Sequence, residues 1–303
     1  MSAAAGSELR FDGKVAVVTG AGQGLGRSHA LLLAQRGAKV VVNDLGGSLD
    51  GSGASSGPAA EVVELIVKNG GEAVASTDNV ATPEGAEAVV QAALDAFGRV
   101  DVLVNNAGIL RDRSLGKMTV EEFDSVLAVH VRGSFLVSRA AFPHMKEQAY
   151  GRIVNTSSPA GLFGNFGQAN YSTAKMGLVG LTKTLGIEGA RAGIRANAIA
   201  PIAWTRMTET LLPAEFEDKF TPERVSPLVA YLAHESCTTS GEVFSVGAGR
   251  VARVFVAEGP GWRTDDLTIE AIAGNWDAIM AEQPYLQPTG LGQQATASLQ
   301  AML

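Results

Sequence analysis

Short apolar runs rich in β-branched residues alternate with longer amphipathic stretches along most of this 303-residue chain. Continuous apolar runs are typical of strands covered on both faces, and apolar residues three and four apart indicate helices. The pattern predicts strands at 14–20, 38–44, 72–78, 100–106, 151–157, 195–200 and 242–247. It predicts helices at 24–36, 59–69, 83–97, 119–149, 170–191 and 222–234. We therefore expect an α/β fold, with a doubly wound parallel sheet of about seven strands and helices on both faces.

A glycine-rich turn follows the first expected strand. KVAVVTG leads into AGQGLG and then into a helix that ends near Gly37. Such glycines let backbone N–H groups approach a pyrophosphate, and the positive end of the helix dipole adds to the attraction. This order of elements predicts a Rossmann-type sheet with a dinucleotide at the turn. The alternative is a strand–turn–helix without a ligand, which the end of the second strand disfavours.

Asp44 ends that second strand, about 20 residues after the turn, where a carboxylate meets the hydroxyl groups of an adenosine ribose. Neither the turn nor Leu45 supplies an Arg or Lys that would neutralise a 2′-phosphate. Because like charges repel, the sequence predicts NAD rather than NADP as the cofactor. The Gly/Ser-rich stretch 46–57 is expected to be a surface loop near the adenosine end.

Tyr171 and Lys175 lie four residues apart, and Ser158 precedes Tyr171 by thirteen residues. Positions four apart share one face of a helix, so the ammonium group of Lys175 would lie beside the phenol. A neighbouring cation favours phenolate and lowers the pKa of a tyrosine from its reference value of about 10. The pair would then serve as an acid/base near neutral pH. Taken alone, it would also fit an ordinary amphipathic helix.

Three motifs of the chain occur together in one family. They are Thr19-Gly20-x-x-x-Gly24-x-Gly26, Asn105-Asn106-Ala107-Gly108, and the set Ser158, Tyr171 and Lys175. Over residues 11–249, the chain therefore resembles the short-chain dehydrogenase/reductase family. The stretches VVVNDLGG, NNAGILRDRS, GNFGQANYS and HES are further similar to the (3R)-hydroxyacyl-CoA dehydrogenase unit of peroxisomal multifunctional enzyme type 2 and its stand-alone bacterial relatives.

The resemblance implies a role for each of these residues. Tyr171 would be the acid/base, Ser158 would hydrogen-bond the substrate oxygen, and Lys175 would bind the nicotinamide ribose and tune Tyr171. The catalytic residues that it implies are Ser158, Tyr171, Lys175 and His130. The cofactor-binding residues that it implies are Gly20, Gln23, Gly24, Leu25, Gly26, Asp44, Asn79, Val80, Asn105, Ala107, Gly108, Tyr171, Lys175, Ile202 and Thr205.

Two positions depart from the family's pattern. His130 stands where the family has an asparagine that relays protons, so it is either a relay or a structural histidine bonded to backbone. Pro201-Ile202 stands where the family has Pro-Gly.

The activity implied by the resemblance is NAD-dependent oxidation of a secondary alcohol, a (3R)-hydroxyacyl-CoA of the β-oxidation or steroid side-chain type. Residues 155–174 carry no charged side chain, which suits the wall of an apolar pocket or a subunit contact. Arg111 and Arg113 would contact CoA phosphates or form a solvated loop. The alternatives are a hydroxysteroid dehydrogenase acting on a free steroid, an acyl-carrier reductase, and a non-catalytic nucleotide-binding scaffold or sensor.

Composition narrows the classes of partner. The net charge of −7 without blocks of like charge argues against nucleic acid and membrane surfaces as partners. Four dispersed histidines and one cysteine predict no metal site. The first residues lack an apolar targeting core, and the last three are not a peroxisomal address, so the cytoplasm is the expected location.

Residues 1–249 are expected to form the NAD-binding core. Residues 250–303 would then be an extension that packs on the core, on another subunit or over the active site, because its tryptophans, Trp262 and Trp276, would be costly to expose. The family resemblance implies a homodimer or homotetramer.

Overall fold

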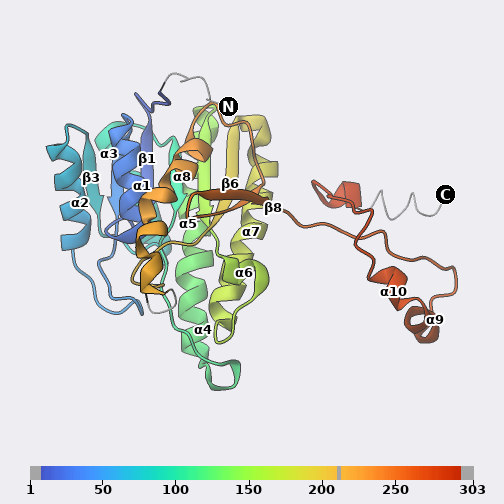
Figure 1. Cartoon of the computed structure of the whole chain (residues 1–303). Coiled ribbons are helices and arrows are strands. Elements are labelled where there is room, and N and C mark those ends of the chain that lie inside the picture. The colour runs from blue at the N-terminus through green and yellow to red at the C-terminus, as the bar shows by residue number, and fades with distance from the viewer. Residues whose placement is uncertain (1–7, 210–212, 295–303) are drawn as a thin grey trace. The chain divides into compact units, whose positions relative to one another are not determined.

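The computed structural model describes residues 8–209 and 213–294. In this part of the chain, eight strands form one sheet in the order β3-β2-β1-β4-β5-β6-β7-β8 (Figure 1). The strands are β1 Val15–Thr19, β2 Lys39–Asn43, β3 Ala73–Ser76, β4 Val102–Asn105, β5 Gly151–Thr156, β6 Ile194–Pro201, β7 Val243–Gly247 and β8 Arg250–Val254. Strands β1 to β7 pair in parallel. The predicted α/β sheet is therefore confirmed.

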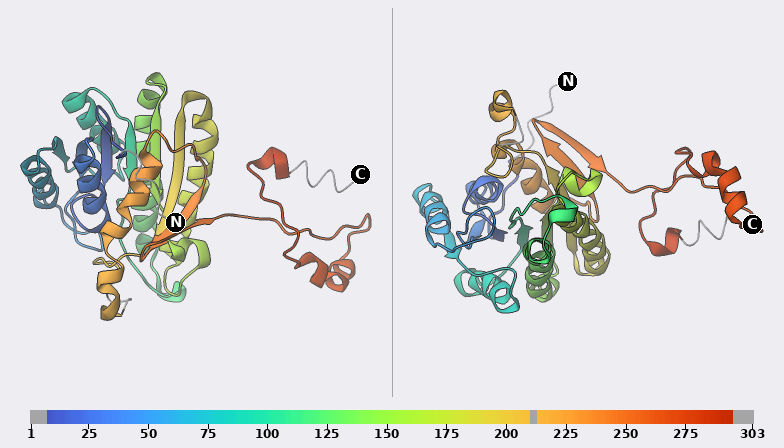
Figure 2. Two further views of the ribbon diagram at one scale, coloured as in Figure 1. Left: turned by 45° about the horizontal axis from the view of Figure 1, so that its top comes forward. Right: turned by 90° about the horizontal axis from the view of Figure 1, so that it is seen from below.

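Helices cover both faces of this sheet, as the two views of Figure 2 show. They are α1 Gly24–Gln35, α2 Gly57–Lys68, α3 Pro83–Phe97, α4 Val120–Leu127, α5 Gly133–Glu147, α6 Pro159–Phe163, α7 Ala169–Gly189 and α8 Ser226–Ala233. Helices α1, α2 and α8 share one apolar core with the sheet, and α3, α5 and α7 share the other. Successive residues of β1 alternate between these cores: Ala16 and Val18 join the first, Val15 and Val17 the second. Both faces of the strand are buried, which explains its unbroken apolar sequence.

Three elements differ from the predictions. The predicted helix 119–149 is two helices, α4 and α5, because a π-helical turn at Ala128–Arg132 separates them. The short helix α6 and the strand β8 were not predicted. Strand β8 follows β7 after Ala248 and Gly249, whose φ angles of 48° and 81° suit a two-residue hairpin turn.

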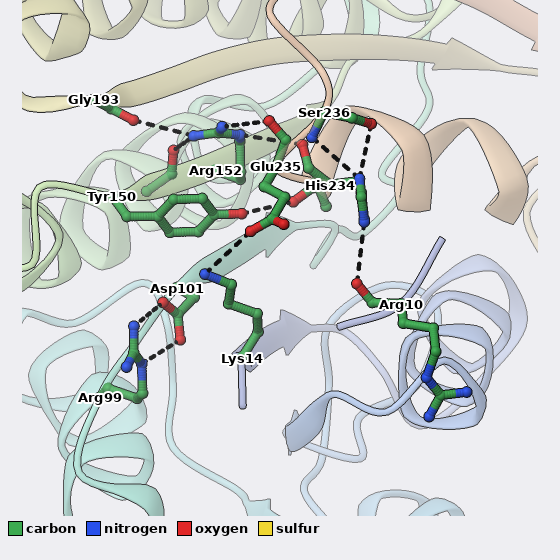
Figure 3. Close-up of polar contacts among 12 residues, drawn as sticks. Arg10, Lys14, Arg99, Asp101, Tyr150, Arg152, Gly193, His234, Glu235 and Ser236 are labelled. Atoms are coloured by element: carbon green, nitrogen blue, oxygen red, sulfur yellow. Dashed lines mark hydrogen bonds and ion pairs between the residues drawn. The ribbon is translucent and has the colours of Figure 1, made fainter. Parts of the chain in front are cut away.

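A buried polar cluster lies at the amino end of β5 (Figure 3). The guanidinium group of Arg152, 5% exposed, donates hydrogen bonds to the carbonyl groups of Gly193, His234 and Glu235 at 3.1, 3.4 and 3.3 Å. It also lies 4.4 Å from the centre of the Tyr150 ring. These contacts join β5 to the start of β6 and to the residues after α8. A buried charge needs such partners. The cluster therefore stabilises the sheet at the amino ends of its strands.

The chain divides into two compact units, one up to Arg253 and one from Val254 onward. The second contains the helices α9 Ile269–Gly274 and α10 Trp276–Ile279. Within it, the backbone groups of Glu258 and Leu286 exchange hydrogen bonds of 2.9 and 2.8 Å. In the described residues, none of the helices has the length and hydrophobicity needed to cross a membrane.

Candidate active site

The turn between β1 and α1 requires glycine at two positions, Gly24 and Gly26. Gly24 has a φ of 53°, a conformation that favours glycine. A Cβ atom on Gly26 would lie 2.1 Å from the carbonyl oxygen of Gly20. The turn therefore keeps its backbone N–H groups accessible at the start of α1, as a pyrophosphate site requires.

Asp44 follows β2 directly and faces this turn. Its Oδ2 accepts a hydrogen bond from the N–H of Gly22 at 2.8 Å, and its Oδ1 accepts one from the N–H of Gly46 at 2.7 Å. The carboxylate is thus held where the sequence predicts a ribose contact, with lone pairs left over to accept from hydroxyl groups.

A cavity of about 420 Å³ lies along the carboxyl ends of the strands. Its walls include ten of the predicted cofactor-binding residues: Gly20, Gln23, Gly24, Leu25, Asp44, Asn79, Val80, Ala107, Gly108 and Thr205. The residues that fit a dinucleotide by their chemistry are therefore brought together. The other five predicted residues are not among the lining residues. Gly26 packs in the turn, Ile202 is exposed, and Asn105 is buried with its amide bonded to Ser138 and Asn155. Tyr171 and Lys175 lie in the first turns of α7.

The cavity also has walls that were not predicted. They include Gly47, Ser48, Leu49 and Gly51 of the loop after β2, and Arg206 and Met207 after β6. The loop is bound to the segment after β4, because Leu110 N–H donates to the Leu49 carbonyl and Arg111 Nε donates to the Asp50 carbonyl, at 3.0 and 2.9 Å. The Gly/Ser-rich composition located the loop near the adenosine end, but no signal in the sequence revealed this contact.

Ser158, Tyr171 and Lys175 come together from two elements. The side chain of Ser158 caps α6 by accepting from Ala160 N–H at 3.2 Å, and its hydroxyl group is close enough to Tyr171 to lower the pKa of the phenol. The Nζ of Lys175 donates to the Thr156 carbonyl at 2.6 Å and lies 5.4 Å from the centre of the Tyr171 ring. The predicted spacing thus produces one group of side chains, placed directly after β5 and in the first turns of α7, in which Lys175 is buried and Ser158 and Tyr171 are partly buried.

Burial controls the protonation of this group. It raises the pKa of Tyr171 to about 12, although the nearby Ser158 hydroxyl group acts in the opposite direction. It also lowers the pKa of Lys175 to about 7. The chain by itself therefore does not lower the tyrosine pKa as the Tyr–Lys spacing predicts, because desolvation disfavours both charged forms.

His130 lies in the π-helical turn between α4 and α5, fully buried. Its Nε2 is 2.9 Å from the carbonyl oxygen and 3.1 Å from the nitrogen of Ile109, and its ring meets the Tyr171 ring edge to face at 5.4 Å. Burial and the charge of Lys175 hold its pKa well below the ordinary value, so the ring is neutral. Its Nδ1 has no hydrogen-bond partner among the described residues.

Comparison with known proteins identifies the family. The family model described as short chain dehydrogenase matches residues 14–215. The chain is 53% identical over 277 residues to peroxisomal multifunctional enzyme type 2 of Mus musculus, an alignment that covers 90% of this chain and 37% of that protein. It is 40% identical over 281 residues to hydroxyacyl-CoA dehydrogenase ChsB1 of Mycobacterium tuberculosis, covering 85% of this chain and 87% of that protein.

A solved structure is also similar. Full-length peroxisomal multifunctional enzyme type 2 from Drosophila melanogaster matches with a TM-score of 0.82 and 41% identity, over 97% of this chain and 50% of that chain. This chain thus spans half or less of the multifunctional proteins from mouse and fly. The cofactor that fits the glycine turn and Asp44 of this chain is NAD. By its sheet, its nucleotide site and these likenesses, the chain belongs to the short-chain dehydrogenase family.

Proposed function

We propose that this chain oxidises a (3R)-hydroxyacyl-CoA, or reduces the corresponding ketone, with NAD as the hydride carrier. The observation that carries the proposal is the group of Ser158, Tyr171 and Lys175 after β5, with Tyr171 packed against the apolar cluster that contains Ile109, a residue that lines the dinucleotide cavity. The name of the Mycobacterium tuberculosis relative supports the substrate class. The bound NAD supplies the hydride acceptor and a positive nicotinamide ring.

The residues of the chain perform the proton chemistry. Tyr171 as phenolate accepts the proton of the alcohol, and Ser158 holds the alcohol oxygen within reach. Lys175 is anchored by the Thr156 carbonyl, so its ammonium group stays close to the phenol and stabilises phenolate when it is protonated. His130 extends this set: Nε2 is held by Ile109, and the unpaired Nδ1 is the atom available for a proton relay. Thr205 is part of the proposed cofactor site, whereas the exposed Ile202 does not line the cavity.

Exposed apolar residues on the segment after Ser158 suit a long acyl group. Phe163 at the end of α6, Phe166 and Leu115 are exposed, Phe166 by 90%. The N–H of Arg113 donates to the Gly167 carbonyl at 2.8 Å, which brings the segment that leads to Leu115 beside the one that follows Phe166. Apolar surface next to a catalytic group indicates a site for an apolar ligand.

A panel of (3R)- and (3S)-hydroxyacyl-CoAs, the matching free acids and free hydroxysteroids tests the substrate class. The (3R) thioesters are expected to have the highest kcat/KM, because the carrier adds binding energy that positions the reacting carbon. The measurement is the initial rate of NADH formation with each substrate. Equal or better turnover of a free hydroxysteroid would contradict the proposal and support the steroid alternative.

A homodimer or homotetramer is also part of the proposal. Along α7, Met176, Gly180, Thr184 and Ile187 are exposed on one face at helical spacing, Ile187 by 61%. A stripe of apolar and small residues on a helix is expected to be covered, and a second copy of the chain offers the same stripe. A cytoplasmic location is supported by the likeness to the mycobacterial dehydrogenase, and the mouse relative is named peroxisomal.

The oligomer can be tested with Gly180→Glu. A Cβ atom at Gly180 meets no atom within 4 Å, so the subunit is expected to fold, while the added charge would lie inside the contact. Light scattering should give a multiple of 31.3 kDa for the native chain and 31.3 kDa for the variant. Val67→Glu, at an exposed position of α2, is the control and should keep the native mass. A monomeric native chain would refute the assignment.

A further inference from the structure

The first turn of α7 is held from within by Asn170, the residue before Tyr171. Asn170 is 0% exposed. Its Oδ1 accepts a hydrogen bond from the N–H of Tyr171 at 2.7 Å. Its Nδ2 donates to the carbonyl groups of Arg111 at 2.8 Å and Glu122 at 3.1 Å. The amide group of Asn170 therefore donates two hydrogen bonds and accepts one, so this buried polar side chain is fully paired.

The bond to the Tyr171 N–H fills a gap in the helix. The first N–H groups of a helix lack partners inside it, and a side chain at the N-cap usually binds one of them. In α7, the N-cap residue Gln168 makes no such bond. Its amide instead donates to the Asp112 carboxylate at 2.6 Å. Asn170 thus takes over the stabilisation of the helix start at the residue that carries the reactive phenol.

The two carbonyl groups that Asn170 binds belong to different walls of the site. Arg111 lies in the segment after β4, lines the dinucleotide cavity and bonds the loop after β2. Glu122 lies in α4, the helix that leads into the turn with His130. The side-chain amide of Asn170 therefore connects the Tyr171 backbone both to the segment after β4 and to α4.

We propose that Asn170 is a positioning residue that fixes the backbone of Tyr171 so that its phenol stays in contact with Ser158. This inference rests on the proposed role of Tyr171 as the acid/base. A tyrosine hydroxyl is far from its Cα atom, so a small tilt of the first helical turn moves it by a larger distance. Misplacement of a reacting group by about 1 Å can cost about 10² in rate.

Asn170→Ala is expected to lower kcat by about 10-fold or more while the affinity for NADH stays unchanged. The pH profile should also change. The Ser158 hydroxyl group lowers the pKa of Tyr171, so moving the phenol away from it should shift the rise of kcat to higher pH. Asn170→Ser keeps an acceptor for the Tyr171 N–H and should recover part of kcat. Asn170→Asp keeps an oxygen there but places a charge against two carbonyl groups, and should not.

Asn197→Ala is the matched control. Asn197 is equally buried and also binds backbone, through the Thr239 carbonyl at 2.8 Å and the Glu242 N–H at 3.2 Å, but it lies in β6 on the side of that strand's amino end. It should lose stability to chemical denaturant without a shift in the pH profile. If Asn170→Ala behaves like Asn197→Ala, or if Asn170→Ser recovers nothing, Asn170 is only structural and the inference fails.

The same set of variants separates this failure from a failure of the proposed function. An inactive Tyr171→Phe together with an unshifted Asn170→Ala profile would overturn the positioning role alone. An active Tyr171→Phe would overturn the proposed function itself, whatever the Asn170 variants show.

Discussion

Tyr171→Phe is expected to lower kcat for alcohol oxidation by about 10² or more, the contribution typical of a general acid/base. Phenylalanine keeps the ring that packs edge to face on His130 at 5.4 Å and loses only the hydroxyl group. The affinity for NAD should change little, because Tyr171 is not among the residues that line the dinucleotide cavity. Steady-state kinetics and an NADH binding titration measure the two effects.

The pH dependence of the native chain follows from the same group. Burial raises the Tyr171 pKa, and oxidation needs the phenolate. The rate of oxidation should therefore rise with pH, and the rate of ketone reduction, which needs the phenol, should fall.

Tyr150→Phe is the control for this substitution. Tyr150 is also partly buried, with a pKa raised to about 12, but it lies just before β5, at the opposite end of that strand from Ser158. Its variant should keep the native kcat. Near-native turnover by a folded Tyr171→Phe chain would instead favour the nucleotide-binding scaffold.

Asp44 is expected to make NAD⁺ better than NADP⁺ by about 10² or more in kcat/KM, since like charges brought together cost several kcal/mol. Asp44→Asn removes the charge and keeps an oxygen for the N–H of Gly22 or Gly46. This variant should raise kcat/KM for NADP⁺ and so reduce the ratio of kcat/KM for NAD⁺ to that for NADP⁺. Kinetics with both cofactors provides the measurement.

Asp78→Asn removes a carboxylate from another wall of the same cavity. Its Oδ2 accepts from the Ser76 hydroxyl at 2.9 Å, away from the turn that Asp44 faces. This variant should change the cofactor ratio less than Asp44→Asn does. Comparable kcat/KM for NAD⁺ and NADP⁺ in the native chain would show that Asp44 does not select the cofactor.

The fold could be predicted where local pattern decides it. Strand β1 is buried on both faces, so its apolar run was sufficient to identify it. Strand β8 contains two arginines and lies at the edge of the sheet, so it lacks such a run. The break at Ala128–Arg132 has no Gly or Pro within it, and helical composition therefore continued through it.

The site shows the same division. Tyr171 and Lys175 could be paired because helical spacing is local. The direction in which the pKa of Tyr171 shifts could not be predicted, because burial depends on the whole fold. The hydrogen bonds of Asn170 to Arg111 and Glu122 join residues at least 48 positions apart. No local sequence pattern near Tyr171 predicts them.

The Arg152 cluster has a consequence for protein engineering. It stabilises the amino ends of the strands, whereas Asp44 and Ser158 follow carboxyl ends. In a library of variants, thermal stability should therefore depend on substitutions at the amino ends of the strands, and turnover on substitutions at their carboxyl ends. Substitutions around Tyr150 and Arg152 offer a way to select for heat resistance without selecting at the same time for altered kinetics.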